Sequence, residues 1–145
     1  MKNLLFLSAI LFSFSSIAQT SSDDRPVRTC DVMPLFVDCA EEVGKAGTVC
    51  TEKAIQAHIG ASVVYPDVAK DAGIQGTVYI KFVIEIDGSI GSIQVMRGVG
   101  DSDSALAMSS AAIDAVMSLP DFLPGSHEGE PVRVELVQPV RFVLN

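Results

Sequence analysis

The sequence contains no tryptophan, and only 6% of its 145 residues are aromatic. It has just two histidines, His58 and His127, and neither stands at metal-ligand spacing from a cysteine or a carboxylate. The three cysteines with the nearby His58 match no zinc pattern. We therefore expect no bound metal and no other cofactor.

The usual signals of catalysis are weak as well. Gly98-Val99-Gly100 resembles the start of a phosphate-binding loop, but Asp101 and Asp103 would repel phosphate and the required third glycine is missing. Ser109-Ser110 has no base nearby in the sequence. These absences predict a protein that is not an enzyme.

Excess positive charge and long apolar runs are also missing. The formal net charge of −8 argues against nucleic acid or an anionic membrane surface as the main partner. The apolar run from Leu4 through Ala18 has about 15 residues, whereas a helix that crosses a bilayer needs roughly 20.

This run has the setting of a secretory signal peptide, with Lys2 before it and the small residue Ala18 preceding Gln19. We predict that residues 1–18 are a signal peptide cleaved after Ala18. An uncleaved inner-membrane anchor is the less favoured alternative. Export places the cysteines in an oxidising compartment, where disulfides form.

Three cysteines allow one disulfide and leave one thiol over. Cys39 and Cys50 flank the compact stretch CAEEVGKAGTVC, in which Gly44 and Gly47 allow the chain to turn back, so we favour a Cys39–Cys50 disulfide. Cys30 would then be a spare thiol. The alternative is that all three thiols are unpaired.

Two segments precede the main domain. The stretch 19–36 is polar at its start and lacks periodicity, so we interpret it as a linker or leader. Residues 37–61 are predicted to be a helical segment stapled by the disulfide, with Thr51 capping a helix from Glu52 to about Ala61.

The main domain, residues 62–145, is expected to open with a short helix. Tyr65-Pro66 starts this helix, because proline is well tolerated at a first helical position, and Gly73 ends it. Apolar and polar residues then alternate from Thr77 to Ile86, which predicts a strand with one buried face. The residues on that face are Val78, Ile80, Phe82, Ile84 and Ile86.

Further elements follow from the same periodicities. Asp87-Gly88 indicates a hairpin turn to a second strand, Ile90–Met96, with Ile93 and Val95 toward the core. Ser104–Leu119 has helical periodicity. The helix residues expected to face the sheet are Leu106, Ile113, Val116 and Leu119.

Alternation returns in the last segment, from Val132 to Leu144, which predicts a third strand. Gln138 falls on its apolar face and needs a hydrogen-bond partner there. A hairpin followed by a right-handed helical crossover gives the strand order 2-1-3. The fold class is therefore α+β, a three-stranded antiparallel sheet packed by helices. Pro139 suits an edge position for the third strand, because proline cannot donate to a ladder.

An exposed edge strand supports two interpretations. It can be an ordinary edge, protected by charge or proline. It can also be a binding device, on which a peptide adds as an extra strand through main-chain hydrogen bonds. Arg133, Glu135 and Arg141 on the outer face would keep the edge soluble and tune which peptide is accepted.

Four stretches resemble, in order, the C-terminal domain of TonB-type energy transducers. The first, YPDVAKDAGIQGTVYIKFVIEIDGSI, has the Tyr-Pro, Gly-x-x-Gly-x-Val and Asp-Gly features of that family. VMRGVG, AAIDAVMSLP and LPGSHEGEPVRVELVQPVRFVLN continue the pattern, so that the resemblance covers about residues 62–145. VMPLF and the Cys39–Cys50 segment look like family variants with an extra stapled helix.

The resemblance implies a periplasmic domain that captures the TonB box, a short segment of an outer-membrane receptor, by strand addition to the last strand. In the family the Tyr-Pro region lies near that contact. The partner-binding residues implied in this sequence are Tyr65, Pro66, Arg133, Glu135, Val137, Pro139 and Arg141.

The sequence departs from the family plan in three ways. It shows no long Pro-rich spacer, and its apolar segment looks cleavable, whereas a tether must both span the periplasm and hold to the membrane to transmit force. These departures concern energy transduction rather than binding. Phe122 also stands where the family often has tryptophan. The alternative function is an anchorless regulatory or self-associating envelope domain, a homodimer formed by edge pairing.

Overall fold

The computed structural model describes residues 25–145, so the predicted signal peptide lies outside the described residues. None of the described helices is long and apolar enough to cross a membrane. In chain order the elements are η1 (Val37–Cys39), α1 (Lys45–Ser62), α2 (Asp67–Asp71), β1 (Gly76–Ile84), β2 (Ile90–Arg97), α3 (Asp103–Met117), β3 (Gly125–His127), β4 (Glu130–Val132) and β5 (Val134–Phe142).

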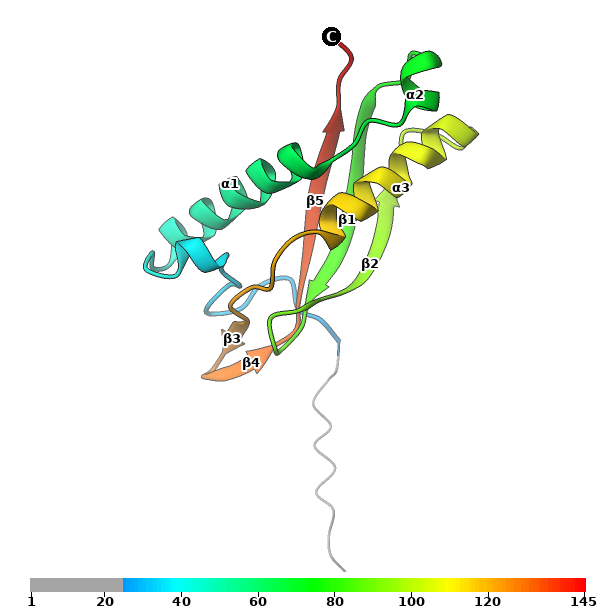
Figure 1. The fold of residues 1–145 in the computed structure, drawn as a ribbon. Coiled ribbons are helices and arrows are strands. Elements are labelled where there is room, and N and C mark those ends of the chain that lie inside the picture. The colour runs from blue at the N-terminus through cyan, green and yellow to red at the C-terminus, as the bar shows by residue number, and fades with distance from the viewer. Residues whose placement is uncertain (1–24) are drawn as a thin grey trace, which may run out of the picture.

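Strand β1 is the centre of a three-stranded antiparallel sheet (Figure 1). It pairs with β2 on one side and with β5 on the other, which gives the order β2-β1-β5. The predicted α+β fold and its 2-1-3 strand order are thereby confirmed. The predicted last strand is divided near Arg133, because β4 pairs with β3 in a separate hairpin while β5 joins the main sheet.

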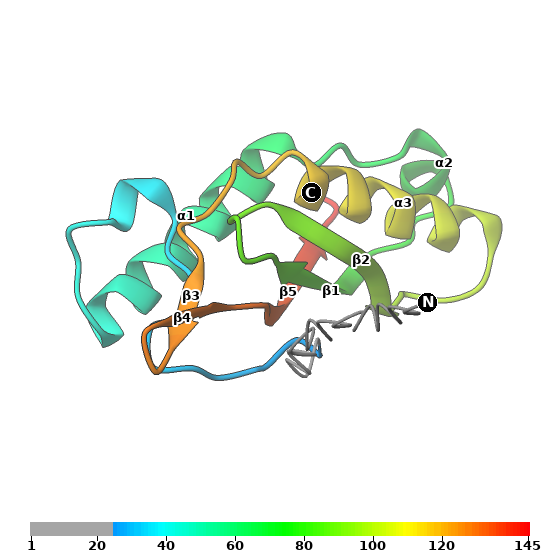
Figure 2. The same ribbon diagram turned by 90° about the horizontal axis from the view of Figure 1, so that it is seen from below.

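The helices cover one face of this sheet (Figure 2). Helix α3 packs on β1 and β2, and α1 lies on the β5 side (Figure 1). Ile80 and Phe82 of β1 and Met108 of α3 are fully buried between these layers. The opposite face of the sheet is left open by the helices of residues 25–145 (Figure 2).

The alternation of β1 produces its buried face as predicted, because Val78, Ile80, Phe82 and Ile84 are all 0% exposed. The prediction for Ile86 is wrong: β1 ends at Ile84, and Ile86 enters the turn with 59% of its surface exposed. Gly88 stands in that turn at φ +85°, a conformation that favours glycine.

Two other core predictions are wrong. Val95 pairs with the buried Ile80 but is itself 38% exposed, because β2 is an edge strand of the sheet. Leu106 is 54% exposed, because α3 turns its row of small residues and Met108 toward the sheet instead. Val116 and Leu119 are buried as expected.

Helix α1 begins at Lys45, earlier than the sequence predicts. Gly44 precedes it at φ +58°, and Thr51 lies inside the helix, where its hydroxyl accepts a hydrogen bond of 3.0 Å from the Phe36 N–H. The predicted capping role of Thr51 is therefore wrong. The expected Cys39–Cys50 disulfide is present and ties η1 to α1.

Candidate functional site

The main sheet has two edge strands, and they differ in regularity. Strand β2 pairs with β1 through two register shifts. Strand β5 pairs with β1 over nine consecutive residues without a shift. Bulged edges resist the addition of another strand, whereas a regular edge presents an even row of backbone donors and acceptors. Strand β5 is therefore the candidate site.

A contact with residues 25–36, the described part of the predicted leader, shows which backbone groups of β5 point outward. The Val27 N–H donates to the Arg133 carbonyl at 2.9 Å, and the Glu135 N–H donates to the Val27 carbonyl at 2.8 Å. Because the direction of backbone groups alternates along a strand, the outward groups belong to the odd-numbered residues of β5. These are Glu135, Val137, Pro139 and Arg141.

The leader already occupies the start of this edge. Val27 forms a parallel bridge with Val134, and the Arg28 guanidinium lies 3.4 Å from the Glu135 carboxylate. The chain then leaves β5 and pairs with the β3 region at Val32 and Leu35. Among the described residues, no segment pairs with the outer edge of β5 beyond Glu135.

Pro139 interrupts the remaining edge. Its nitrogen carries no hydrogen, and its carbonyl accepts a hydrogen bond of 3.0 Å from Nε2 of Gln138. This bond supplies the partner that the buried Gln138 amide was predicted to need. The outward amides left for a guest strand are those of Val137 and Arg141.

The charged side chains at the start of the edge are engaged by neighbours. The Arg133 guanidinium donates to both carboxylate oxygens of Glu85, at 2.7 Å and 3.2 Å. Glu135 is held by Arg28, as described above. Arg141 is exposed and makes no ion pair within residues 25–145, and Val137 is 45% exposed. The side chains of the edge that are exposed and make no ion pair within residues 25–145 therefore lie in its second half.

The two residues of the Tyr-Pro pair contact different parts of the structure. The Tyr65 ring packs edge-on against Phe142, the last residue of β5, with 5.3 Å between centroids, and its hydroxyl donates to the Ile74 carbonyl. Pro66 instead lines a hollow with Ala107 and Ala111 of α3. Tyr65 thus supports the end of the edge strand, while direct contact of either residue with a guest stays a prediction.

A cavity beside the edge could not be foreseen from the sequence, because it depends on where α1 packs. It has a volume of about 480 Å³ and lies between the last turns of α1 and the second half of β5. Gln138, Pro139 and Arg141 line it from β5, Thr77 and Tyr79 line it from β1, and Ile59 and Gly60 line it from α1.

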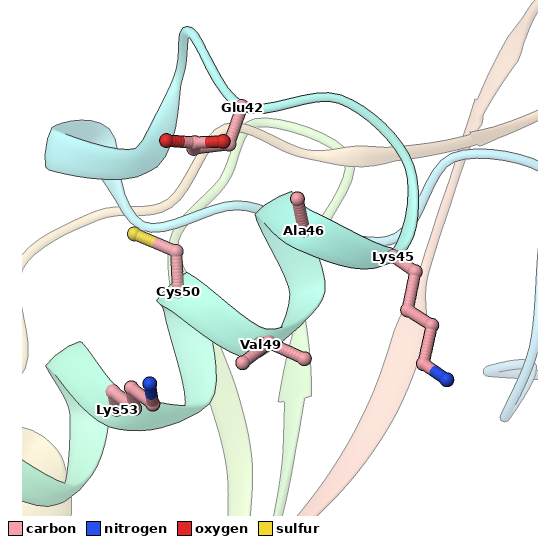
Figure 3. Close-up of a pocket in the computed structure, with 6 residues that line it drawn as sticks. All are labelled: Glu42, Lys45, Ala46, Val49, Cys50 and Lys53. Carbon is pink, nitrogen blue, oxygen red and sulfur yellow. The ribbon is translucent and has the colours of Figure 1, made fainter.

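Another hollow, of about 620 Å³, lies beside the disulfide, and none of its lining residues belongs to β5. Figure 3 shows Glu42 across from Cys50 and Ala46, whereas Lys45 points away from them. Glu42, Lys45 and Ala46 are exposed, so this hollow is an open surface rather than an enclosed site. Residues 25–145 contain no group of three or more metal-ligating side chains suited to hold an ion.

Cys30 carries the thiol that the disulfide leaves over. Burial raises the pKa of this thiol, and the adjacent Asp31 carboxylate raises it further. The Cys30 sulfur lies 3.0 Å from the Val32 carbonyl, to which the thiol donates. Both effects favour the protonated thiol, which is a poorer nucleophile than the thiolate.

Comparisons with known proteins agree with this architecture. The family model described as the Gram-negative bacterial TonB protein C-terminal matches residues 61–144. Protein TonB of Helicobacter pylori is 29% identical over 82 residues, which are 57% of this chain but only 27% of that protein's length.

Two solution structures of the H. pylori TonB C-terminal domain are similar as well. The longer one aligns with a TM-score of 0.50 at 24% identity, covering 74% of this chain and 90% of that domain. The shorter one gives 0.43 at 27% identity, covering 63% of this chain and 90% of that domain. The longer structure supports the shared fold, and the family match extends over more than half of the chain. This protein therefore belongs to the family of TonB C-terminal domains.

Proposed function

We propose that this protein is a periplasmic, non-enzymatic module that binds TonB-box segments of outer-membrane receptors by strand addition to β5, in energy-dependent transport. The observation that carries the proposal is the outer edge of β5 at Val137 and Arg141, which no segment of residues 25–145 pairs with, next to a place where the same edge already accepts a strand. The family membership and the predicted signal peptide support the receptor as partner and the periplasm as location.

A guest strand that extends the parallel pairing begun by Val27 would form a defined set of main-chain hydrogen bonds with β5. By the spacing that Val27 sets, its first bonding residue donates to the Glu135 carbonyl and accepts from the Val137 N–H. Its second donates to the Val137 carbonyl but meets no donor at Pro139. Its third accepts from the Arg141 N–H, and it reaches the Pro139 carbonyl only if the Gln138 amide yields.

These main-chain bonds alone do not hold a guest. A hydrogen bond contributes about 1 kcal/mol net, and ordering each guest residue costs about 1–2 kcal/mol of backbone entropy. Four or five such bonds over about five guest residues therefore give no net affinity without side-chain contacts. Side chains must supply both the affinity and the selectivity.

The leader is expected to limit how far a guest extends along the edge. Val27→Pro removes the donor to the Arg133 carbonyl, one of the two hydrogen bonds of this bridge. The other bond, from the Glu135 amide to the carbonyl of residue 27, should then open more often, so the Glu135 amide should exchange faster. A guest long enough to reach Arg133 should then bind about three to ten times more tightly, because it gains the sites that Val27 held. Amide exchange and a peptide titration check both results. Unchanged exchange at Glu135 in the variant would show that Val27 does not hold this edge in solution.

Receptor capture tests the proposed function directly. The immobilised mature protein is expected to retain a receptor from outer-membrane extract, and a free peptide carrying that receptor's TonB box should release it. The same receptor lacking its TonB box serves as control and should pass through. Equal retention of both forms would contradict the proposal.

The same edge suits pairing with a second copy of this chain, which is the alternative function. A regular antiparallel pair of β5 strands would use the same Val137 and Arg141 amides. Self-pairing predicts that dilution, rather than the TonB-box peptide, changes the amide signals of Val134–Val140. Sequencing the mature N-terminus adds a separate check, since an N-terminus at Gln19 excludes direct coupling to an inner-membrane motor.

A further inference from the structure

The cavity between α1 and β5 reaches around the edge of the sheet. Gln138 belongs to the helix-facing row of β5, whereas Pro139 and Arg141 belong to the open-face row, and all three line the cavity. Thr77 and Tyr79 of β1, which pair with Arg141 and Pro139, also line it, so one part of the cavity lies on the helix side and another on the open face. The cavity therefore opens where a guest strand would lie. Its volume of about 480 Å³ falls within the range of about 300–1,000 Å³ that is usual for ligand pockets.

The wall supplied by α1 is apolar and leaves room. Ile59 is 4% exposed, and the half-buried Val63 continues the wall just after the helix. Gly60 has no side chain, and a Cβ built on it would meet no atom within 4 Å. Gln56 stands exposed at the rim. This wall suits an aliphatic or aromatic side chain.

The alternation of side chains decides which guest residues reach this wall. Residues that lie opposite each other on neighbouring strands point to the same face of the sheet. A guest residue opposite Gln138 or Val140 therefore points to the helix side, toward α1. This holds whether the guest runs parallel or antiparallel to β5, because the face is set by the residue opposite.

We infer that the cavity between α1 and β5 is a side-chain subsite, which takes a branched aliphatic or aromatic side chain from the guest residue opposite Gln138 or Val140. The inference rests on the proposed function, because the subsite serves only a strand added to β5. The occupant follows from position, since Pro139 and Arg141 line the cavity and belong to the edge of β5 that no segment of residues 25–145 pairs with.

Part of the subsite wall comes from residues of α1 that precede the matched family segment. Gln56, Ile59 and Gly60 lie before residue 61, where the match to the TonB C-terminal model begins. The helix that holds them is fixed by the Cys39–Cys50 disulfide and by burial of Ile55 and Ile59. Selection of the guest at this point therefore depends on α1, whereas the main-chain bonds depend on β5.

A bulky residue at position 60 tests the subsite. Gly60→Phe should fill the cavity from the exposed side of α1 and weaken binding of a synthetic TonB-box peptide about tenfold, with an unchanged thermal unfolding midpoint as the check on folding. Ala61→Phe is the matched control, because Ala61 is exposed on the same helix and does not line the cavity. Its affinity should stay within about twofold of the unsubstituted protein.

A double-mutant cycle identifies the occupant. Each apolar residue of the peptide is replaced by alanine and titrated against the unsubstituted protein and the Gly60→Phe variant. One replacement should weaken binding to the unsubstituted protein about tenfold and should change binding to the Gly60→Phe variant little. If Gly60→Phe does not fold, Gly60→Leu takes its place in the same cycle.

The outcomes separate the two proposals. Unchanged affinity in Gly60→Phe, with peptide still perturbing the Val137 and Arg141 amides, overturns the subsite and leaves strand addition standing. Failure of the peptide to perturb those amides in the unsubstituted protein overturns strand addition, and the subsite with it.

Discussion

Val137→Pro is expected to weaken binding of a TonB-box peptide roughly 30- to 100-fold while leaving the fold almost intact. The substitution removes an outward N–H, and it leaves the facing guest carbonyl without a donor, a loss of about 2–3 kcal/mol together. Proline is tolerated on an edge strand where the N–H faces solvent, so the free energy of unfolding should change by less than about 1 kcal/mol. Peptide titration and urea denaturation measure the two effects.

The adjacent residue provides the control. Leu136 lies opposite Phe82, and its backbone groups point toward β1 by the same alternation that turns those of Val137 outward. Leu136→Pro should therefore break the ladder and destabilise the protein, as Val137→Pro does not. Full affinity in a folded Val137→Pro variant would count decisively against binding at this edge.

Removal of the disulfide is expected to have the largest effect on stability. Cys39 and Cys50 close a loop with a sequence separation of 11, for which loop-closure entropy gives about 3 kcal/mol. The double variant Cys39→Ala/Cys50→Ala should lose about that much free energy of unfolding, because the unfolded chain gains freedom and Cys39 leaves a small space in the core. Urea denaturation measures the loss.

Cys30→Ala is the matched control for the disulfide. Cys30 is a free thiol in the leader, so its replacement should change the free energy of unfolding by less than about 0.5 kcal/mol. The same urea denaturation midpoint for the double variant and the unsubstituted protein would mean that the disulfide does not constrain the unfolded chain. Because the bridge ties η1 to α1, we also expect the double variant to bind the peptide less tightly through a looser α1–β5 cavity.

The main sheet could be predicted from the sequence because its strands carry local signals. Every second residue of β1 is apolar and buried, at Val78, Ile80, Phe82 and Ile84, and the Asp87-Gly88 turn fixes the hairpin. The sequence pattern alone therefore predicts the central strand of the sheet. The place of β5 at the edge followed from the helical crossover and from Pro139.

The occupied part of the edge could not be predicted in the same way. Val27 is an isolated apolar residue in a polar stretch, and its bridge to Val134 joins residues more than a hundred positions apart. The pairing of Arg133 with Glu85 likewise depends on the register between β5 and β1. Local periodicity contains no information about such contacts.

The start of α1 was not predicted for a different reason. Residues 45–50 carry a glycine and a β-branched valine and threonine, which lower helix propensity, and Thr51 offered a conventional cap. The disulfide and the packing of Ile55 and Ile59 override that propensity and extend the helix toward Gly44. The cavity beside β5 follows from this tertiary placement.

The most direct test of strand addition is the pattern of amide changes along β5 when the peptide is titrated into the isotopically labelled protein. Strand addition at β5 predicts that the Val137 and Arg141 amides shift and become protected against exchange, while the amides of Leu136 and Val140, already bonded to β1, keep the protection they had. A saturated complex in which the amides of Val137 and Arg141 exchange as fast as in the free protein would contradict it.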